Sequence, residues 1–161
     1  MIYIGIDPGL TGAIAVLWAE NQVADMPTTV AGKGVVKREV NGVLLADMLR
    51  PFCGTPGNVW VVLERTSAMP GQGVASMFSM GVSRGVVLGV LGALGVPFID
   101  VAPQTWKAHF RLLGADKDAS RTLALRRFPE LAGYLARKGD HNRAEALLLA
   151  VYGLDTANKT W

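Results

Sequence analysis

Two acidic residues each end an apolar run of the chain. Asp7 follows the run Ile2–Ile6, and Glu64 ends the run Asn58–Glu64. Both runs are rich in β-branched and aromatic residues, so they are predicted to be buried strands that deliver a carboxylate where they leave the core. Taking a carboxylate out of water is costly unless a cation meets it, and two carboxylates on adjacent strands repel each other. A divalent metal ion between Asp7 and Glu64 would satisfy both.

Asp7 also has a simpler interpretation as a turn residue. Pro8, Gly9 and Gly12 follow it closely, and an Asp side chain at such a position can accept hydrogen bonds from nearby backbone N–H groups. The apolar runs on either side, which end at Val16, are then the arms of a β-hairpin. This stretch by itself leaves both interpretations open.

The last predicted helix brings further acidic residues. Glu145 lies within the apolar run Ala144–Val151, where a charge is unfavourable unless it faces a partner. His141 lies one turn earlier on the same side of the helix, and Asp140 stands at the helix start. The alternative is that Asp140 is an ordinary N-cap and that Glu145 is partly exposed.

Apolar periodicity and turn residues predict the elements that carry these side chains. A strand over Val96–Val101 follows a long helix, which gives a β-α-β unit and therefore a parallel strand pair. Asn41 and Asp140 are the expected N-caps, and Gly153 is the expected C-terminal cap. The expected elements are a hairpin over 1–16, strands over 22–27, 58–64 and 96–101, and helices over 40–52, 74–94, 118–128 and 140–153, with a short helix that opens at 103–107.

Three glycines, Gly81, Gly85 and Gly89, share one face of the long helix. Each costs about 1 kcal/mol relative to alanine inside a helix, so their spacing indicates a close approach of another backbone. We expect this face to pack on the sheet, with a contact to a second subunit as the alternative.

The composition indicates one folded domain over residues 1–161. Half of the residues are hydrophobic, which argues against disorder. The single cysteine, Cys53, cannot form an internal disulfide and excludes a zinc site of several cysteines. The uncharged segment 85–99 is too short for a bilayer span, and the apolar start carries Asp7 with no basic region before it, so we expect neither a membrane segment nor a signal peptide.

The net charge of +3 is unevenly distributed along the chain. Basic residues outnumber acidic ones between Val101 and Arg143, which predicts a face that binds phosphates. The alternative is a solvated helix surface without a partner. The basic residues of this region are Lys107, Arg111, Lys117, Arg121, Arg126, Arg127, Arg137, Lys138 and Arg143, against Asp116, Asp118, Glu130 and Asp140.

Taken together, these motifs resemble those of RuvC-type Holliday junction resolvases, of the kind found in bacteriophages. No single motif is specific, but their order and spacing are, and they extend from Ile2 to Gly153. The matching segments are Ile4–Gly9 with Thr11–Gly12, the strand acid Glu64, Ser83–Val86, Val96–Pro97, Pro103–Lys107 and Asp140–Leu147. The resemblance implies a ribonuclease H-like α/β fold, with a mixed five-stranded sheet flanked by helices.

The same resemblance implies a function. Such proteins are homodimers that bind four-way DNA junctions and cut two opposed strands, using two magnesium or manganese ions at each active site. We therefore expect a junction-resolving endonuclease in the cytoplasm of a bacterium or of a phage-infected cell. A non-cleaving junction-binding protein of the same fold is the alternative, and a nuclease for other branched DNA would share these features. The segment Asp7–Gly12 is also similar to the phosphate loop of actin-like ATPases, but those need two large lobes, for which this chain is too short.

The resemblance also implies four catalytic and metal-binding carboxylates, which are Asp7, Glu64, Asp140 and Glu145. Bacterial members carry two acids, or a histidine and an acid, three residues apart on the last helix. In this chain Asn142 stands three residues before Glu145, so Asp140 is assigned and His141 is its possible substitute.

Basic and aromatic residues complete the implied site. By the same resemblance, Lys107 corresponds to the family lysine that lies near the scissile phosphate, and we expect it to be a catalytic residue. The segment 65–73 lacks the aromatic residue that wedges into the junction, and Phe78 is the candidate to replace it. The expected contacts to DNA are Arg84, Lys107, Arg111, Lys117 and Arg121.

Overall fold

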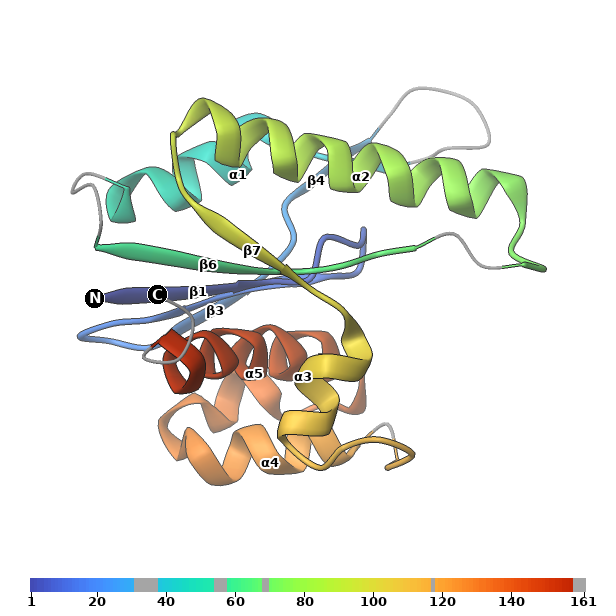
Figure 1. The fold of residues 1–161 in the computed structure, drawn as a ribbon. Coiled ribbons are helices and arrows are strands. Elements are labelled where there is room, and N and C mark those ends of the chain that lie inside the picture. Colours follow the sequence, from blue (N-terminus) through green and yellow to red (C-terminus); the bar gives the residue numbers. More distant parts are fainter. Residues whose placement is uncertain (31–37, 54–57, 68–69, 117, 158–161) are drawn as a thin grey trace.

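The computed structural model describes residues 1–30, 38–53, 58–67, 70–116 and 118–157. Its centre is a mixed sheet of five strands in the order β3-β2-β1-β6-β7, which confirms the expected fold class (Figure 1). These strands are β1 (Ile2–Ile6), β2 (Ala13–Leu17), β3 (Gln22–Asp25), β6 (Val59–Glu64) and β7 (Phe98–Val101).

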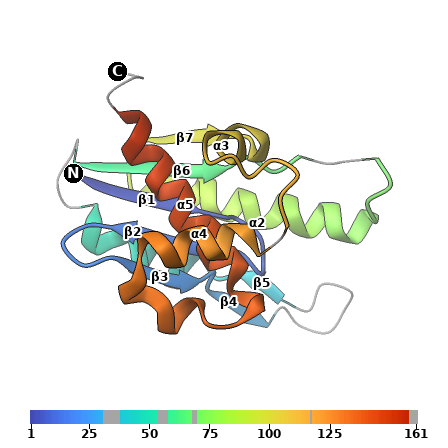
Figure 2. The same cartoon turned by 90° about the horizontal axis from the view of Figure 1, so that it is seen from below.

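Helices cover both faces of this sheet. In Figure 1, α1 and α2 lie on one face and α5 lies on the other, with α3 and α4 beside it. Figure 2 shows that α5 crosses the strands diagonally. The helices are α1 (Gly42–Leu49), α2 (Val74–Ala93), α3 (Pro103–His109), α4 (Ala119–Arg127) and α5 (His141–Thr156), with short 3-10 turns η1 (Arg50–Phe52), η2 (Pro129–Leu135) and η3 (Lys138–Asp140).

The pairing of the central strands sets the place of the acidic residues. β1 is antiparallel to β2, which confirms the predicted hairpin. β1 is parallel to β6, with Ile6 opposite Leu63. β6 and β7 are also parallel, as the β-α-β pattern predicts. Because parallel strands end at the same edge, the residues that end β1 and β6 lie at one edge of the sheet.

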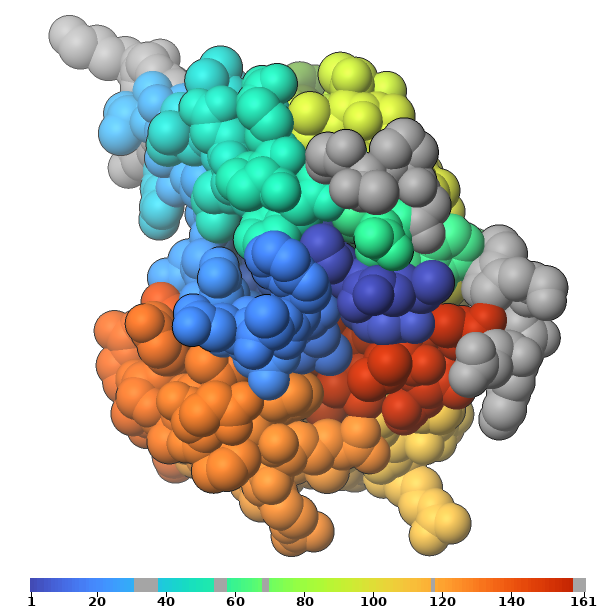
Figure 3. All heavy atoms as spheres, turned by 90° about the vertical axis from the view of Figure 1, so that its left-hand side faces the viewer, coloured from blue at the N-terminus to red at the C-terminus, as the bar shows by residue number. Residues whose placement is uncertain are grey.

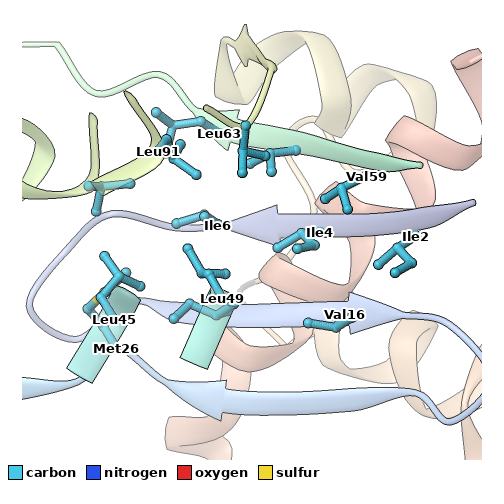
Figure 4. Packing of buried hydrophobic residues seen from close by; sticks show 14 of the residues in the cluster. Ile2, Ile4, Ile6, Val16, Met26, Leu45, Leu49, Val59, Leu63 and Leu91 are labelled. Carbon is cyan, nitrogen blue, oxygen red and sulfur yellow. The ribbon is translucent and has the colours of Figure 1, made fainter. Parts of the chain in front are cut away.

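The two faces of the sheet bury different parts of the core. Ile2, Ile4 and Ile6 point to the face that Leu45 and Leu49 of α1 cover (Figure 4). The alternate residues of β1 point to α5, because successive side chains of a strand face opposite ways. An unbroken apolar strand such as β1 is therefore the expected result of burial on both faces.

The closest approach between layers is that of α5 to β1 at Gly5. A methyl group on Gly5 would overlap backbone atoms of Ala146 and Ala150 in α5. Gly153 has a related role, since its added methyl would lie 2.7 Å from Cγ2 of Val62. The expected C-terminal cap at Gly153 is thus wrong: α5 continues to Thr156, and Gly153 is a buried packing position.

The start of α1 follows the prediction. The side chain of Asn41 accepts a hydrogen bond from the backbone N–H of Leu44 at 3.0 Å, which satisfies one of the free donors at the helix start. The helix ends at Leu49, two residues before Pro51.

The glycine face of α2 does not pack on the sheet. Methyl groups on Gly81, Gly85 and Gly89 would have no neighbour within 4 Å among the described residues, so the expected sheet contact is wrong. The helix instead buries Val87 and Leu91 on its other side. By length and composition alone, α2 is also apolar enough to cross a membrane.

A small antiparallel pair, β4 (Thr28–Val30) and β5 (Arg38–Val40), lies apart from the main sheet. The sequence analysis did not predict it, because each strand has only three residues and most of them are exposed. Residues 31–37, which connect the two strands, lie outside the described residues.

The end of the molecule at which β1 begins shows the same layers on its surface. In Figure 3 the segment of α1 lies on one side of the first strands, and the segments of α4 and α5 lie on the other. Met1, Trp18 and Leu154 are exposed and line a hollow of about 590 Å³. Asp7 and Glu64 leave the sheet at the opposite end, to which β1 and β6 run (Figure 1).

The variant Gly5→Ala is expected to lose about 3 kcal/mol or more of unfolding free energy, because the added methyl would meet the backbone of α5, which cannot rotate away. Urea unfolding followed by circular dichroism would measure the change.

Gly92→Ala is the matched control. Gly92 lies in α2 with open space around an added methyl, so this variant is expected to gain about 0.5–1 kcal/mol from helix propensity. Equal stabilities of the two variants would contradict the close approach of α5 to β1.

Candidate active site

Asp7 is held at the sheet edge by a tight turn. Its Oδ1 accepts a hydrogen bond from the backbone N–H of Gly9 at 3.2 Å. Gly12 is required here because a methyl group on it would overlap the carbonyl oxygen of Asp7. Burial raises the pKa of Asp7, the Gly9 N–H opposes this rise, and the negative charge of Glu145 adds to it. Asp7 is thus both a turn residue and a member of a charged cluster.

Glu64 lies beside Asp7 and is bound by a buried tryptophan. The indole Nε1–H of Trp106, which has no exposed surface, donates to Oε1 of Glu64 at 2.9 Å. Burial, followed by the negative charge of Asp7, raises the pKa of Glu64 to about 7, although the indole hydrogen bond lowers it. Such a shift is characteristic of carboxylates that share one site.

Glu145 reaches this cluster from the first turns of α5. Its Oε1 lies 3.0 Å from Nζ of Lys107 and 3.3 Å from Oγ of Ser120, which is buried on α4. These residues line a hollow of about 260 Å³ beside the carboxylates. Glu145, the one charged residue within the apolar run of α5, therefore faces a lysine and a polar hollow.

His141 and Asn142 form the first turn of α5 beside the cluster. Nδ1 of His141 lies 3.2 Å from the carbonyl oxygen of Lys138, and the His141 side chain lies close enough to Asp7 for the two to interact electrostatically. Asn142 donates to the carbonyl oxygen of Thr11 at 2.5 Å. The start of α5 is therefore attached to the turn that carries Asp7.

Asp140 faces away from this cluster. Its Oδ1 lies 2.9 Å from Nη2 of Arg137, and its Oδ2 accepts the backbone N–H of Arg137 at 2.8 Å. Arg143 lies near it as well, at 3.8 Å. The hydrogen bonds from Arg137 hold the pKa of Asp140 below its ordinary value. Asp140 therefore stands at the N-cap position of α5, as expected, but its side chain closes the η3 turn and makes no capping hydrogen bond to α5.

The basic residues expected to contact DNA divide into two groups. Arg84 binds Oδ2 of Asp100 at 2.6 Å and the carbonyl oxygen of Glu64 at 3.3 Å, so it braces the end of β6. Arg121 donates to both carboxylate oxygens of Asp118, at 2.6 and 2.8 Å, so it is held at the start of α4.

Lys107 and Arg111 are better placed to meet a ligand. Lys107 lies in the cluster, and Arg111 is exposed. Lys117 lies outside the described residues. Phe78, the candidate wedge, is 64% exposed on α2.

Trp106 and Ser120 belong to the site but were not identified from the sequence. Trp106 immediately precedes Lys107 in a helix opened by Pro103, and a tryptophan in such a segment is most simply interpreted as core. Ser120 gives no signal of its own, because serine is common in helices with solvated faces. Its burial against Glu145 depends on how α4 packs on α5.

The donor set fits a hard divalent ion. Asp7, Glu64 and Glu145 offer carboxylate oxygens, which Mg²⁺ and Mn²⁺ prefer. A cation would offset the burial and the repulsion that raise the pKa of Asp7 and that of Glu64. Within the described part of the chain, no group of three or more His, Cys, Asp or Glu side chains is arranged to hold an ion. Trp106 binds one oxygen of Glu64 and leaves the other for an ion. Lys107 binds Glu145, so Glu145 would have to turn from the lysine to meet an ion.

Comparison with solved structures defines the fold as RuvC-like. The structure of Thermus thermophilus RuvC superimposes with a TM-score of 0.56 and 17% sequence identity, over 98% of this chain and 97% of that one. T. thermophilus RuvC in complex with a Holliday junction substrate gives a TM-score of 0.55 with 18% identity, over 99% and 97%.

Comparison of sequences identifies a relative of this chain in a green alga. The chain is 32% identical over 126 residues to the chloroplastic Holliday junction resolvase MOC1 of Chlamydomonas reinhardtii. The match covers 78% of this chain but spans only 14% of the length of that relative. No family model matches the chain.

The variant Asp140→Asn tests the structural role of this residue. It is expected to lose about 2 kcal/mol of unfolding free energy at neutral pH, because Arg137 loses its charged acceptor. The folded state lowers the pKa of Asp140 from 3.8, so the stabilisation is present above this value and is lost as the pH falls through the folded-state pKa. The difference in urea unfolding between variant and wild type should therefore shrink below about pH 4.

His141→Ala is the companion variant. It is expected to keep the stability of the wild type within about 0.5 kcal/mol, because its side chain is only partly buried, and to bind Mn²⁺ about 10-fold more weakly in calorimetric titrations. Loss of Mn²⁺ binding in Asp140→Asn, with normal binding in His141→Ala, would instead identify Asp140 as the metal ligand at the start of α5.

Proposed function

We propose that the protein is a metal-dependent endonuclease that resolves four-way DNA junctions or other branched DNA by paired cuts. The observation that carries the proposal is the convergence of Asp7, Glu64, Glu145 and Lys107 at one sheet edge. Three carboxylates with one lysine form an arrangement suited to phosphodiester hydrolysis. The RuvC-like fold and the similarity to MOC1 support junction DNA as the substrate.

Asp7, Glu64 and Glu145 would hold two Mg²⁺ or Mn²⁺ ions, with His141 on the side from which Asp140 is turned away. Such ions activate a water molecule and stabilise the leaving oxygen of the phosphodiester. The turn after Asp7 keeps its carboxylate at the edge of the site.

Lys107 is placed to act on the scissile phosphate. In the protein alone its Nζ binds Glu145, one of the proposed ligands. If Glu145 served as a metal ligand, Lys107 would be free to stabilise negative charge on the phosphate. The lysine would then exchange a carboxylate partner for a phosphate.

The basic surface would supply the affinity for DNA. Of the predicted residues that the structure describes, Arg84 and Arg121 are held in ion pairs that brace the fold, whereas Arg111 is exposed and Lys107 lies in the cluster. We propose that the exposed basic residues between Val101 and Arg143 bind the DNA backbone, with an affinity that falls steeply with salt.

We further propose that two copies associate through α2. Its glycine face is open, and Val74 and Phe78 are exposed at its first turns. A long apolar helix with an exposed side needs a partner, and a second copy would place two active sites on one junction. The exposed Phe78 is also the candidate for contact with the junction centre.

The proposed setting is the cytoplasm of a bacterium or of a phage-infected cell. DNA junctions arise there during recombination. The free thiol of Cys53 is consistent with a reducing compartment.

Purified protein is expected to cut a synthetic four-way junction into nicked duplexes with Mg²⁺ or Mn²⁺. Asp7→Asn should bind the junction but cut it at least about 10³-fold more slowly, because the carboxylate at the centre of the cluster is lost. Gel electrophoresis of labelled junctions would measure both properties.

Asp47→Asn is the matched control, because Asp47 is an exposed acid on α1, far from the cluster in the chain. It should cut as fast as the wild type. Intact junctions after incubation of the wild type with either metal would overturn the nuclease and favour a non-cleaving junction-binding protein.

The dimer is tested by Gly85→Arg. An arginine on the open glycine face would place a charge in the proposed contact, so the variant should elute from gel filtration as a monomer where the wild type elutes as a dimer. Thr122→Arg adds the same charge on the exposed face of α4 and should leave the dimer intact. A monomeric wild type at micromolar concentration would contradict the association.

A further inference from the structure

We propose that Trp106 is a positioning residue of the active site, which holds Glu64 through its indole N–H and Lys107 through its ring face. The inference rests on the proposed function, since it concerns how the metal-binding and phosphate-binding groups are held. One buried side chain would thus arrange two groups with opposite charges.

The indole N–H fixes one oxygen of Glu64. An indole has a single donor and no acceptor, and that donor lies 2.9 Å from Oε1 of Glu64. The terminal torsion of a glutamate is broad when nothing restrains it. With Oε1 bound to Trp106, rotation about this torsion is restricted and Oε2 is the oxygen left for an ion. Among the described residues, no hydrogen bond to Oε2 is formed.

The ring face of the same indole lies under the lysine. Nζ of Lys107 is 5.0 Å from the centroid of the Trp106 ring, which is within the range of a cation–π interaction. The same Nζ lies 3.0 Å from Oε1 of Glu145. The ammonium group would therefore stay near the cluster if Glu145 served as a metal ligand, because the aromatic ring lies beneath it.

The indole itself is held by the core of the protein. Trp106 is fully buried in a cluster with Val62, Val101, Leu148 and Leu149. Its ring also meets that of Phe110 edge-on, at 6.5 Å between centroids. A side chain packed between the sheet and α5 has one available position, so it transmits the placement of these layers to Glu64 and Lys107.

Packing alone does not explain the choice of tryptophan. A buried aliphatic or phenyl side chain would fill such a space without an N–H group to satisfy, and an unpaired buried N–H is costly. Here the N–H meets a charged group of the active site.

The first test uses Trp106→Phe, which keeps an aromatic ring and removes the N–H. Its affinity for Mn²⁺ in the absence of DNA, measured by titration calorimetry, should fall about 10-fold, the effect typical of losing a group that orients a metal ligand. Trp18→Phe is the control, because Trp18 follows the last residue of β2 and is 57% exposed. The Mn²⁺ affinity of this variant should equal that of the wild type. Equal affinities of Trp106→Phe and wild type would overturn the inference.

The second test needs no substitution at Trp106. In ¹H–¹⁵N spectra of the wild type, titration with Mg²⁺ should shift the indole resonance of Trp106, because its acceptor becomes a metal ligand, and should leave that of Trp18 unchanged. A Trp106 resonance that does not move at saturating Mg²⁺ would overturn the inference, even where the phenylalanine variant fails to fold.

The variant Trp106→Leu separates the role of the ring face from that of the N–H, because it removes both the N–H and the ring, whereas Trp106→Phe removes only the N–H. At saturating Mn²⁺, Trp106→Leu should cut about 10-fold more slowly than Trp106→Phe, because Lys107 loses its aromatic support. Equal rates of the two variants would overturn this part. Failure of the wild type to cut junctions would overturn the proposed function, whereas its Mn²⁺ affinity and indole shift still decide the role of Trp106 at Glu64.

Discussion

Repulsion between carboxylates at one edge of the sheet is the constraint on which the rest of the structure depends. The parallel pairing of β1 with β6 brings Asp7 next to Glu64, and α5 adds Glu145. Burial and mutual repulsion raise the pKa of Asp7 and that of Glu64. Among the described residues, Asp7 accepts a backbone N–H, Glu64 accepts an indole N–H, and Glu145 is met by the ammonium group of Lys107 and the hydroxyl of Ser120. The site is therefore held together by the fold against its own charge.

Most of the fold could be predicted from local patterns. The buried strands of the sheet are dense in β-branched residues, and the hairpin and the β-α-β unit follow from their order. Gly153 was misinterpreted, because a glycine that ends a helix and a glycine that lets a strand approach look alike in sequence. The structure distinguishes them, since Val62 of β6 packs directly against Gly153 of α5. The glycine face of α2 was misinterpreted because the spacing of glycines alone does not distinguish a packed helix face from an open one.

The candidate site was predictable where one residue conflicts with its surroundings. Asp7 and Glu64 end apolar strands, and Glu145 interrupts an apolar helix, so each carries its own signal. The choice between Asp140 and His141 had no such signal, because it depends on how the η3 turn is closed by Arg137, which is a matter of geometry. Trp106 was overlooked for a further reason: its polar atom is one among many apolar ones, and its partner is 42 residues away in the chain.

The contact between Gly5 and α5 has a mechanical consequence. Because backbone lies directly against backbone there, the helix can neither tilt towards the sheet nor slide along it without a collision. The framework that carries Asp7 and Glu145 therefore behaves as one solid piece. Any fit of the site to ions or to a bent DNA strand must then come from side-chain rotation and from the position of the whole subunit, because the distance between these two elements is already at its minimum.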